Sequence, residues 1–234
     1  MISDLSSADI APRKGAKQAR SAQTVRVILE AAARVLENHG LAGFKTHAVA
    51  AKAGVSVGSL YQYFPRKDAL MAALIRDDVT RFQIEIESVV TRCADTDLAS
   101  GLNALADAAL DHQLARWRLA LILDLEESRL PMDDEAQAAN RNIRTSLQRF
   151  LGRSLTGWPG DLVAATAADM LTLAKALIDT ASQTGSVDRD DLKQRVLAAV
   201  GGYLAHTAAT KGYPCPDVST PRPGHHAKAP RGSK

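Results

Sequence analysis

Hydrogen-bonding side chains are crowded into one short segment of the chain, Gly58 to Phe64, with the sequence GSLYQYF. Aromatic residues make up only 4% of the chain, yet this segment holds Tyr61, Tyr63 and Phe64. On a helix, Leu60 and Phe64 face the same way because they are four residues apart, so the polar side chains around them are left to face outward. Hydroxyl and amide groups on such a surface can pair with base edges or bond to phosphates.

The segment is too short to be a stable helix by itself, because isolated helices under about 12 residues are marginal in water. Two preceding helices, placed by the 3.6-residue period of apolar residues, can hold it. The first is expected to run from Ser21, as N-cap, to Gly40, as C-terminal stop. The second is expected to run from Thr46, as cap, to Gly54. Pro65 ends the third, because a residue before proline avoids helical geometry.

Residues 46–64 therefore read as helix, glycine turn, helix, which is the order of a helix-turn-helix. Ala50 and Ala53 are small enough for two short helices to cross closely, and Gly54 supplies the positive φ of the turn. Gly58 costs the third helix about 0.5–1 kcal/mol relative to alanine. That cost is reasonable where a backbone must approach a partner closely, or where it relieves crowding at the helix start.

The run FKTHAVAAKAGVSVGSLYQYFPRKDAL, Phe44 to Leu70, resembles the DNA-binding domain of the TetR family of bacterial transcriptional regulators, and the resemblance covers residues 22–70. It implies that eight residues contact DNA, namely Thr46, Ser56, Gly58, Ser59, Tyr61, Gln62, Tyr63 and Lys67. By the family's pattern, the first two and the last two bind phosphates, and the four between them meet base edges. Gln62 carries an amide that can pair bidentately with adenine, and Tyr61 can pack on a thymine methyl group.

Lys67 begins a fourth helix, where a cation opposes the helix dipole unless a phosphate docks there. The alternative is a solvated lysine beside Asp68. Three further positions, Lys45, His47 and Arg66, depart from the commonest family pattern, and each adds or can add positive charge. These departures bear on base specificity rather than on DNA binding itself.

The whole sequence predicts an all-α protein, because alternating β-branched runs are nearly absent. The expected organisation is a flexible basic arm over 1–21, a three-helix helix-turn-helix domain over 22–68, a helical bundle over 69–211 and a disordered Pro-rich basic tail over 212–234. Bundle helices are predicted from Lys67 onward and over 98–118, 119–128, 134–155, 161–184 and 188–209. The net charge is +3, with its basic excess at the two ends, which suits a polyanionic partner at the N-terminal end.

The resemblance implies that the bundle binds a small molecule and forms a homodimer through its last two long helices. Two apolar stripes fit that second role. They consist of Ala164, Ala167, Ala168, Leu171, Ala174, Leu177, Ile178 and Ala181, and of Leu192, Val196, Val200 and Tyr203. The alternative is that both stripes pack only inside one chain.

Candidate ligand contacts are His112, Arg116, Trp117 and Met170, although each suits ordinary packing or surface exposure equally well. The scarcity of aromatic residues favours an aliphatic or modestly polar ligand over a large planar cation. An acidic run is interpreted as a solvated surface between helices rather than as metal ligands, because no histidine lies nearby at ligand spacing. Its members are Asp124, Glu126, Glu127, Asp133, Asp134 and Glu135.

Other functional classes find little support. The chain carries no HExxH or P-loop motif, and Cys93 and Cys215 stand alone. No apolar run approaches the roughly 18–20 residues of a membrane span. We therefore expect no enzyme activity, no cofactor, no metal site and a cytoplasmic location.

Together these features predict a homodimeric, ligand-responsive transcription factor. It is expected to be a repressor that binds double-stranded DNA at a palindromic operator and is released by a small-molecule inducer. The alternative, from another class, is a helical-bundle small-molecule-binding protein or enzyme in which the helix-turn-helix domain is incidental.

Overall fold

A computed structural model describes residues 19–131, 133–183 and 187–218. Within these ranges the chain forms nine helices and no strand, which confirms the all-α prediction. The helices are α2 (Ala19–Gly43), α3 (Thr46–Ala53), α4 (Val57–Tyr63), α5 (Lys67–Arg92), α6 (Leu98–Ala115), α7 (Trp117–Glu127), α8 (Asp134–Ser154), α9 (Gly160–Gln183) and α10 (Arg189–Lys211). The predicted N-terminal arm before residue 19 and the tail after residue 218 lie outside the described residues.

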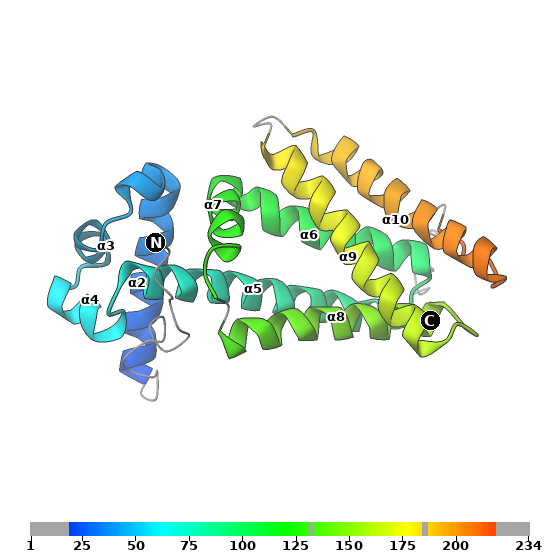
Figure 1. Ribbon diagram of the computed structural model, residues 1–234, viewed down its shortest axis with the longest axis horizontal. Coiled ribbons are helices and arrows are strands. Elements are labelled where there is room, and N and C mark those ends of the chain that lie inside the picture. Colours follow the sequence, from blue (N-terminus) through cyan, green and yellow to red (C-terminus); the bar gives the residue numbers. More distant parts are fainter. Residues whose placement is uncertain (1–18, 132, 184–186, 219–234) are drawn as a thin grey trace, which may run out of the picture.

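The helices form two groups, and α5 runs from one into the other (Figure 1). α2, α3 and α4 gather at one end of the molecule, and α6, α8, α9 and α10 form a bundle at the other. Within the bundle α8 lies along α5, and α10 lies along α9. The short α7 stands between the groups and contacts α2 on one side and α6 and α9 on the other.

The first hydrophobic core holds the helix-turn-helix. It is made by α2, α3, α4 and the first part of α5, and α7 adds Leu119 and Leu123. Leu60 and Phe64 attach α4 and its end to this core, since both side chains are fully buried. Burial of side chains of this size contributes about 1.5–3 kcal/mol each. Tertiary packing therefore stabilises a helix that is too short to form alone.

The second core lies in the bundle, and α5 contributes to both cores. Leu70 and Leu74 are buried in the first core, and Ile86 and Val90 in the second. The predicted domain boundary after residue 68 falls inside the first turn of α5. The domain ranges stay predictions.

Two helix caps differ from the sequence-based expectation. α2 begins before Ser21, so Ser21 lies inside the helix, and its buried hydroxyl has no partner within the described part of the chain. Lys45, with an extended backbone, is the N-cap of α3, and Thr46 is the first helical residue. Gly40 breaks the helical path with φ of 59°, as expected, but the chain then resumes a helical turn. The N-cap of α3 therefore lies one residue before the hydroxyl residue Thr46.

The predicted helix over 98–118 ends at Ala115, because Arg116 leaves helical geometry with φ of −137° and ψ of 51°. The guanidinium of Arg116 instead reaches Glu37 of α2, with a nitrogen–oxygen distance of 2.7 Å. The break therefore coincides with a contact between the bundle and the first group of helices.

The apolar stripes of α9 and α10 face the inside of the chain. Leu192, Val196 and Val200 are 1%, 3% and 5% exposed, and Ala167 and Ile178 are also buried. The buried members of both stripes pack in the intrachain cores, while Ala164, Ala168 and Tyr203 are only half-buried, and a dimer through these helices stays a prediction. A helix on the outside of a bundle buries its widest apolar face against that bundle.

In the ranges that the structure covers, no helix has both the length and the apolar character of a membrane crossing.

Candidate nucleic-acid interface and ligand cavities

One face of α4 is polar and open to solvent. Gly58 and Gln62 are exposed, Tyr61 is 41% exposed, and Ser56 is exposed just before the helix. The opposite face holds the buried Leu60. α4 therefore presents phenol, amide and hydroxyl groups on a helix whose position is fixed by its apolar side.

Hydrogen bonds define the turn before α4. Gly54 has φ of 67°, a left-handed conformation that glycine adopts at little cost, and the N–H of Val55 donates to the carbonyl of Ala50 at 3.1 Å. The N–H of Ser59 then donates to Oγ of the N-cap Ser56 at 3.0 Å. Both ends of the turn are thus closed by bonds to backbone amides, which fixes α4 relative to α3.

Gly58 is not required by the chain itself. Its φ is not positive, and a Cβ built there would lie 3.8 Å from Oγ of Ser56, an ordinary van der Waals distance. Crowding at the helix start therefore does not explain this glycine. Its uncovered backbone is accessible to a partner.

The two tyrosines of α4 have different surroundings. The hydroxyl of Tyr61 lies 3.1 Å from Oγ1 of Thr46, so a hydrogen bond joins α4 to the start of α3. Tyr63 is half-buried and packs against the first core. Ser59 is also half-buried. The expectation that all polar side chains of α4 are largely free is therefore wrong for Tyr63 and Ser59.

Lys67 is exposed but has specific neighbours. Its Nζ donates to the carbonyl oxygen of Leu41 at 3.3 Å and lies 5.4 Å from the ring centre of Phe44. The carboxylate of Asp68 binds Arg129 instead, at 2.7 Å. Lys67 is thus held over the end of α2.

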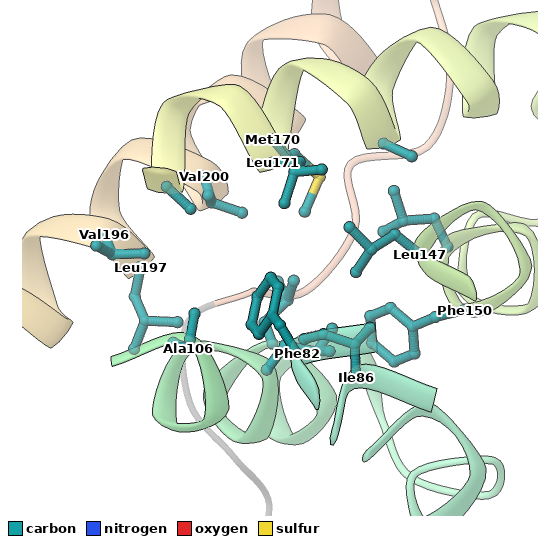
Figure 2. A pocket seen from close by; sticks show the side chains of 16 residues that line it. Phe82, Ile86, Ala106, Leu147, Phe150, Met170, Leu171, Val196, Leu197 and Val200 are labelled. Atoms are coloured by element: carbon teal, nitrogen blue, oxygen red, sulfur yellow. The ribbon is translucent and has the colours of Figure 1, made fainter. Parts of the chain in front are cut away.

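The bundle contains two adjoining cavities. The first has a volume of about 70 Å³ and is lined only by apolar side chains, from α5, α6, α8, α9 and α10. Figure 2 shows the ring of Phe82 in the space between α6 and α9, with Met170 on the α9 side. The second has a volume of about 150 Å³. The two share Phe82, Ala109, Leu171 and Ala174, so they lie side by side.

The second cavity is polar and carries an excess of acidic groups. Its polar lining consists of Asp78, His112, Gln113, Asp124, Glu127, Asn140, Lys175 and Asp179. Nζ of Lys175 lies 2.6 Å from a carboxylate oxygen of Asp124 and 3.1 Å from one of Asp179. Burial alone would lower the pKa of Lys175, but its hydrogen bonds and charge interactions with Asp124 and Asp179 together raise that pKa. Nε2 of His112 lies 3.2 Å from Asp78.

Glu127 differs from the other carboxylates of this cavity. Its side chain is hydrogen-bonded to Asn140, and the positive charge of Lys175 acts on it without the hydrogen bonds that Lys175 makes with Asp124 and Asp179. Burial raises the pKa of Glu127, because removal of water disfavours the charged form.

The structure separates the four predicted ligand contacts. Met170 lines the apolar cavity and His112 the polar one. Arg116 and Trp117 are not among the lining residues of either cavity. Hydrogen bonds with Glu37 raise the pKa of Arg116, and Trp117 is 36% exposed beneath the guanidinium of Arg118.

The solvated-surface interpretation of the acidic run is wrong for most of its members. Asp124 and Glu127 line the polar cavity, Glu126 is 7% exposed and binds Arg129, and Asp133 caps α8. The i, i+3 spacing of Asp124 and Glu127, beside a buried Leu123, could have indicated one shared face. Across the described ranges, no group of three or more histidine, cysteine, aspartate or glutamate side chains is arranged to hold a metal ion.

Known proteins resemble this chain first in its helix-turn-helix. Residues 28–74 match the family described as bacterial regulatory proteins, tetR family. The A-factor receptor protein of Streptomyces griseus is 35% identical over 72 residues, which are 31% of this chain and 26% of that protein. The match therefore spans about a quarter of the relative's length.

Solved structures resemble a larger part of the chain. A putative TetR-family transcriptional regulator from Mesorhizobium loti has a TM-score of 0.66 at 22% identity, covering 81% of this chain and 98% of that one. The regulator FadR from Bacillus subtilis, in complex with stearoyl-CoA, has a TM-score of 0.60 at 18% identity, covering 75% and 96%. Residues 28–74 are therefore similar to the tetR family of bacterial regulatory proteins, and the chain as a whole shares its helical fold with these solved structures.

Proposed function

We propose that the chain is a ligand-responsive repressor that binds operator DNA as a dimer through the exposed face of α4. The observation that carries this proposal is a polar surface on a helix whose apolar side, Leu60 with Phe64, is fully buried. An α-helix fits the major groove, where amide and hydroxyl side chains read base edges. The exposed Lys45, Lys52 and Arg66 lie on the same motif and supply attraction for phosphates.

Within this proposal the contacts divide by chemistry. Base edges are met by Gly58, Ser59, Tyr61 and Gln62, and phosphates by Thr46, Ser56, Tyr63 and Lys67. The hydrogen bond between Thr46 and Tyr61 supports this division, because it holds a phosphate-binding and a base-facing residue in one geometry. The open backbone at Gly58 supports a close approach of DNA at the start of α4.

A small molecule in the bundle cavities is proposed to change the position of α4. Two elements connect these sites. α5 lines both cavities through Phe82 and begins at Lys67, beside the helix-turn-helix. α7 lines the polar cavity through Asp124 and packs Leu119 into the first core. FadR, which shares the fold, was solved with stearoyl-CoA, and this supports a small-molecule role for the bundle.

The proposed dimer uses the exposed faces of α9 and α10 rather than their buried stripes. Ala165 and Ala176 are exposed on α9, and Ala198 and Gly202 on α10. A Cβ on Gly202 would meet no atom of the chain within 4 Å. Glycine inside a helix costs about 1 kcal/mol relative to alanine, and close approach of a second chain gives a reason for it. Two subunits then present two α4 helices to successive major grooves, about 34 Å apart.

Selection of random duplex DNA by the purified full chain at physiological salt tests this function. An enriched palindrome is the expected result, and a reporter under that operator then distinguishes repression from activation. Enrichment of no sequence above a salt-sensitive background, with and without removal of bound small molecules, contradicts DNA reading. That outcome favours the alternative in which the bundle is the working part.

A further inference from the structure

The chemistry of the two adjoining cavities restricts the kind of ligand that the proposed regulator can bind. All sixteen side chains that line the first cavity are apolar, and Figure 2 shows them converging on one space. The second cavity adds four carboxylates and one lysine. A molecule that occupies both therefore needs an aliphatic part and a polar head.

The charges that line the polar cavity determine which charge that polar head should carry. Lys175 is already bound to Asp124 and Asp179, so it is not available to a ligand anion without breaking those pairs. Asp78 contacts His112 and lies 3.7 Å from the exposed Arg81, which is outside the cavity lining. Glu127 feels the charge of Lys175 but is hydrogen-bonded to the uncharged Asn140 rather than to Lys175.

We propose that the ligand is an aliphatic amine whose alkyl chain fills the apolar cavity and whose protonated amino group binds in the polar cavity at Glu127. The inference rests on the proposed function and specifies the inducer class. A protonated amine at Glu127 offsets the excess of four carboxylates over one lysine in this lining. A carboxylate head would instead enter a partly desolvated site already holding four acidic groups, where like charges repel strongly.

Three probes of equal chain length test the head group: octylamine, 1-octanol and octanoate. Their affinities for the purified full chain are measured by calorimetric titration at neutral pH, with the ligand-induced rise in Tm as a second readout. Octylamine is expected to bind about tenfold more tightly than 1-octanol, because a charged hydrogen bond replaces a neutral one. Octanoate is expected to bind most weakly.

The variant Glu127→Gln isolates the proposed ammonium contact. It keeps the size of the side chain and the acceptor for Asn140, so it should fold normally. We expect it to weaken octylamine binding about tenfold and to leave 1-octanol binding unchanged. Glu87→Gln is the control, because Glu87 lies on α5 outside both cavities and accepts from Gln83 at 3.1 Å. It should change neither affinity.

The proposal of an amine ligand is overturned if octanoate or 1-octanol binds at least as tightly as octylamine. It is also overturned if none of the three binds, or if Glu127→Gln leaves the preference for octylamine intact. None of these results contradicts the proposed regulator, since selection of an operator needs no ligand. Failure of that selection counts against the regulator whichever head group binds.

Discussion

Gln62 and Lys67 are both exposed, but in the proposed regulator they should affect DNA binding differently. Gln62→Ala is expected to relax the preference at one base position by about 1–3 kcal/mol, because a bidentate amide contact reads one base. Lys67→Ala should weaken binding to all sequences alike and reduce the salt dependence by about one phosphate contact. Binding titrations on single-base operator variants at several salt concentrations measure both effects. Equal losses on every sequence for both variants would show that Gln62 does not read bases.

Replacement of Gly58 by alanine should change stability and DNA binding in opposite directions. Gly58→Ala should raise the free energy of unfolding by about 0.5–1 kcal/mol, because a Cβ meets only Oγ of Ser56 at 3.8 Å and glycine weakens helices. The same methyl group should weaken operator binding if DNA approaches the backbone there. Urea unfolding and operator titration measure the two effects. A variant that is more stable and binds DNA as tightly as the parent would place the DNA elsewhere.

Glu127 should make stability depend on pH in a defined direction. Burial raises the pKa of Glu127, so the folded state binds the proton more tightly than the unfolded state. Stability is therefore lost as the pH rises from the ordinary pKa of glutamate through the raised one. Glu127→Gln removes that loss and should raise Tm by roughly 1–3 °C at neutral pH. The difference in Tm between the variant and the parent should shrink as the pH is lowered. Thermal unfolding across pH, with Glu87→Gln as control, tests the sign.

At the scale of elements, α7 is shared by the polar cavity and the first core. Arg116 at its start binds Glu37 of α2, and Arg129 just after its end binds Asp68 of α5, each at 2.7 Å. Both pairs bridge the bundle and the helix-turn-helix group. In the proposed regulator we therefore expect α7 to transmit the effect of a ligand in the cavity.

Arg116→Ala tests that transmission. We expect ligand affinity to stay unchanged, because Arg116 does not line either cavity. The coupling free energy between ligand binding and operator binding should fall by about 1 kcal/mol. Arg118→Ala is the matched control, since this arginine lies on the same helix and stacks on the exposed Trp117. Operator titrations with and without ligand give the coupling. An undiminished ligand effect in Arg116→Ala would exclude the Arg116 to Glu37 pair from the transmission.

The elements themselves are largely readable from the sequence, because their signals are local. Gly54 and Pro65 mark the ends of α3 and α4, and the 3.6-residue period locates the later helices. The start of α3 differs by one residue from the prediction, because Lys45 takes the extended N-cap conformation without a side-chain cap bond. The cavities could not be predicted, because they depend on residues far apart in the chain. Asp124 and Lys175, for example, are 51 positions apart.

A periodic pattern also shows which face of a helix is apolar without showing what covers it. Val196 and Val200 have the spacing of a contact stripe, and the same spacing fits packing inside one chain or between two. Only the fold shows that these side chains are buried within the bundle. The dimer must therefore be argued from the opposite, exposed face.

At the scale of the whole molecule, one chain supplies one α4, whereas a palindromic operator requires two at a fixed separation. The exposed face of α10 around Gly202 is our proposed contact between subunits. Gly202→Arg should leave the fold of each chain intact, because a Cβ there meets nothing within 4 Å. The long side chain should block the close approach of a second chain, and sedimentation should then give the 25.0 kDa monomer.

Loss of the dimer should lower affinity for a two-site operator by about 10²-fold or more while sparing a single half-site, since linked binding of two modules gives gains of that order. Gly152→Arg is the matched control, because Gly152 is an exposed glycine on α8 whose Cβ would make only an ordinary contact. A Gly202→Arg protein that sediments as a dimer and keeps its operator affinity would move the interface away from α10. The spacing of the two α4 helices, and with it the route from cavity to operator, would then need another pair of faces.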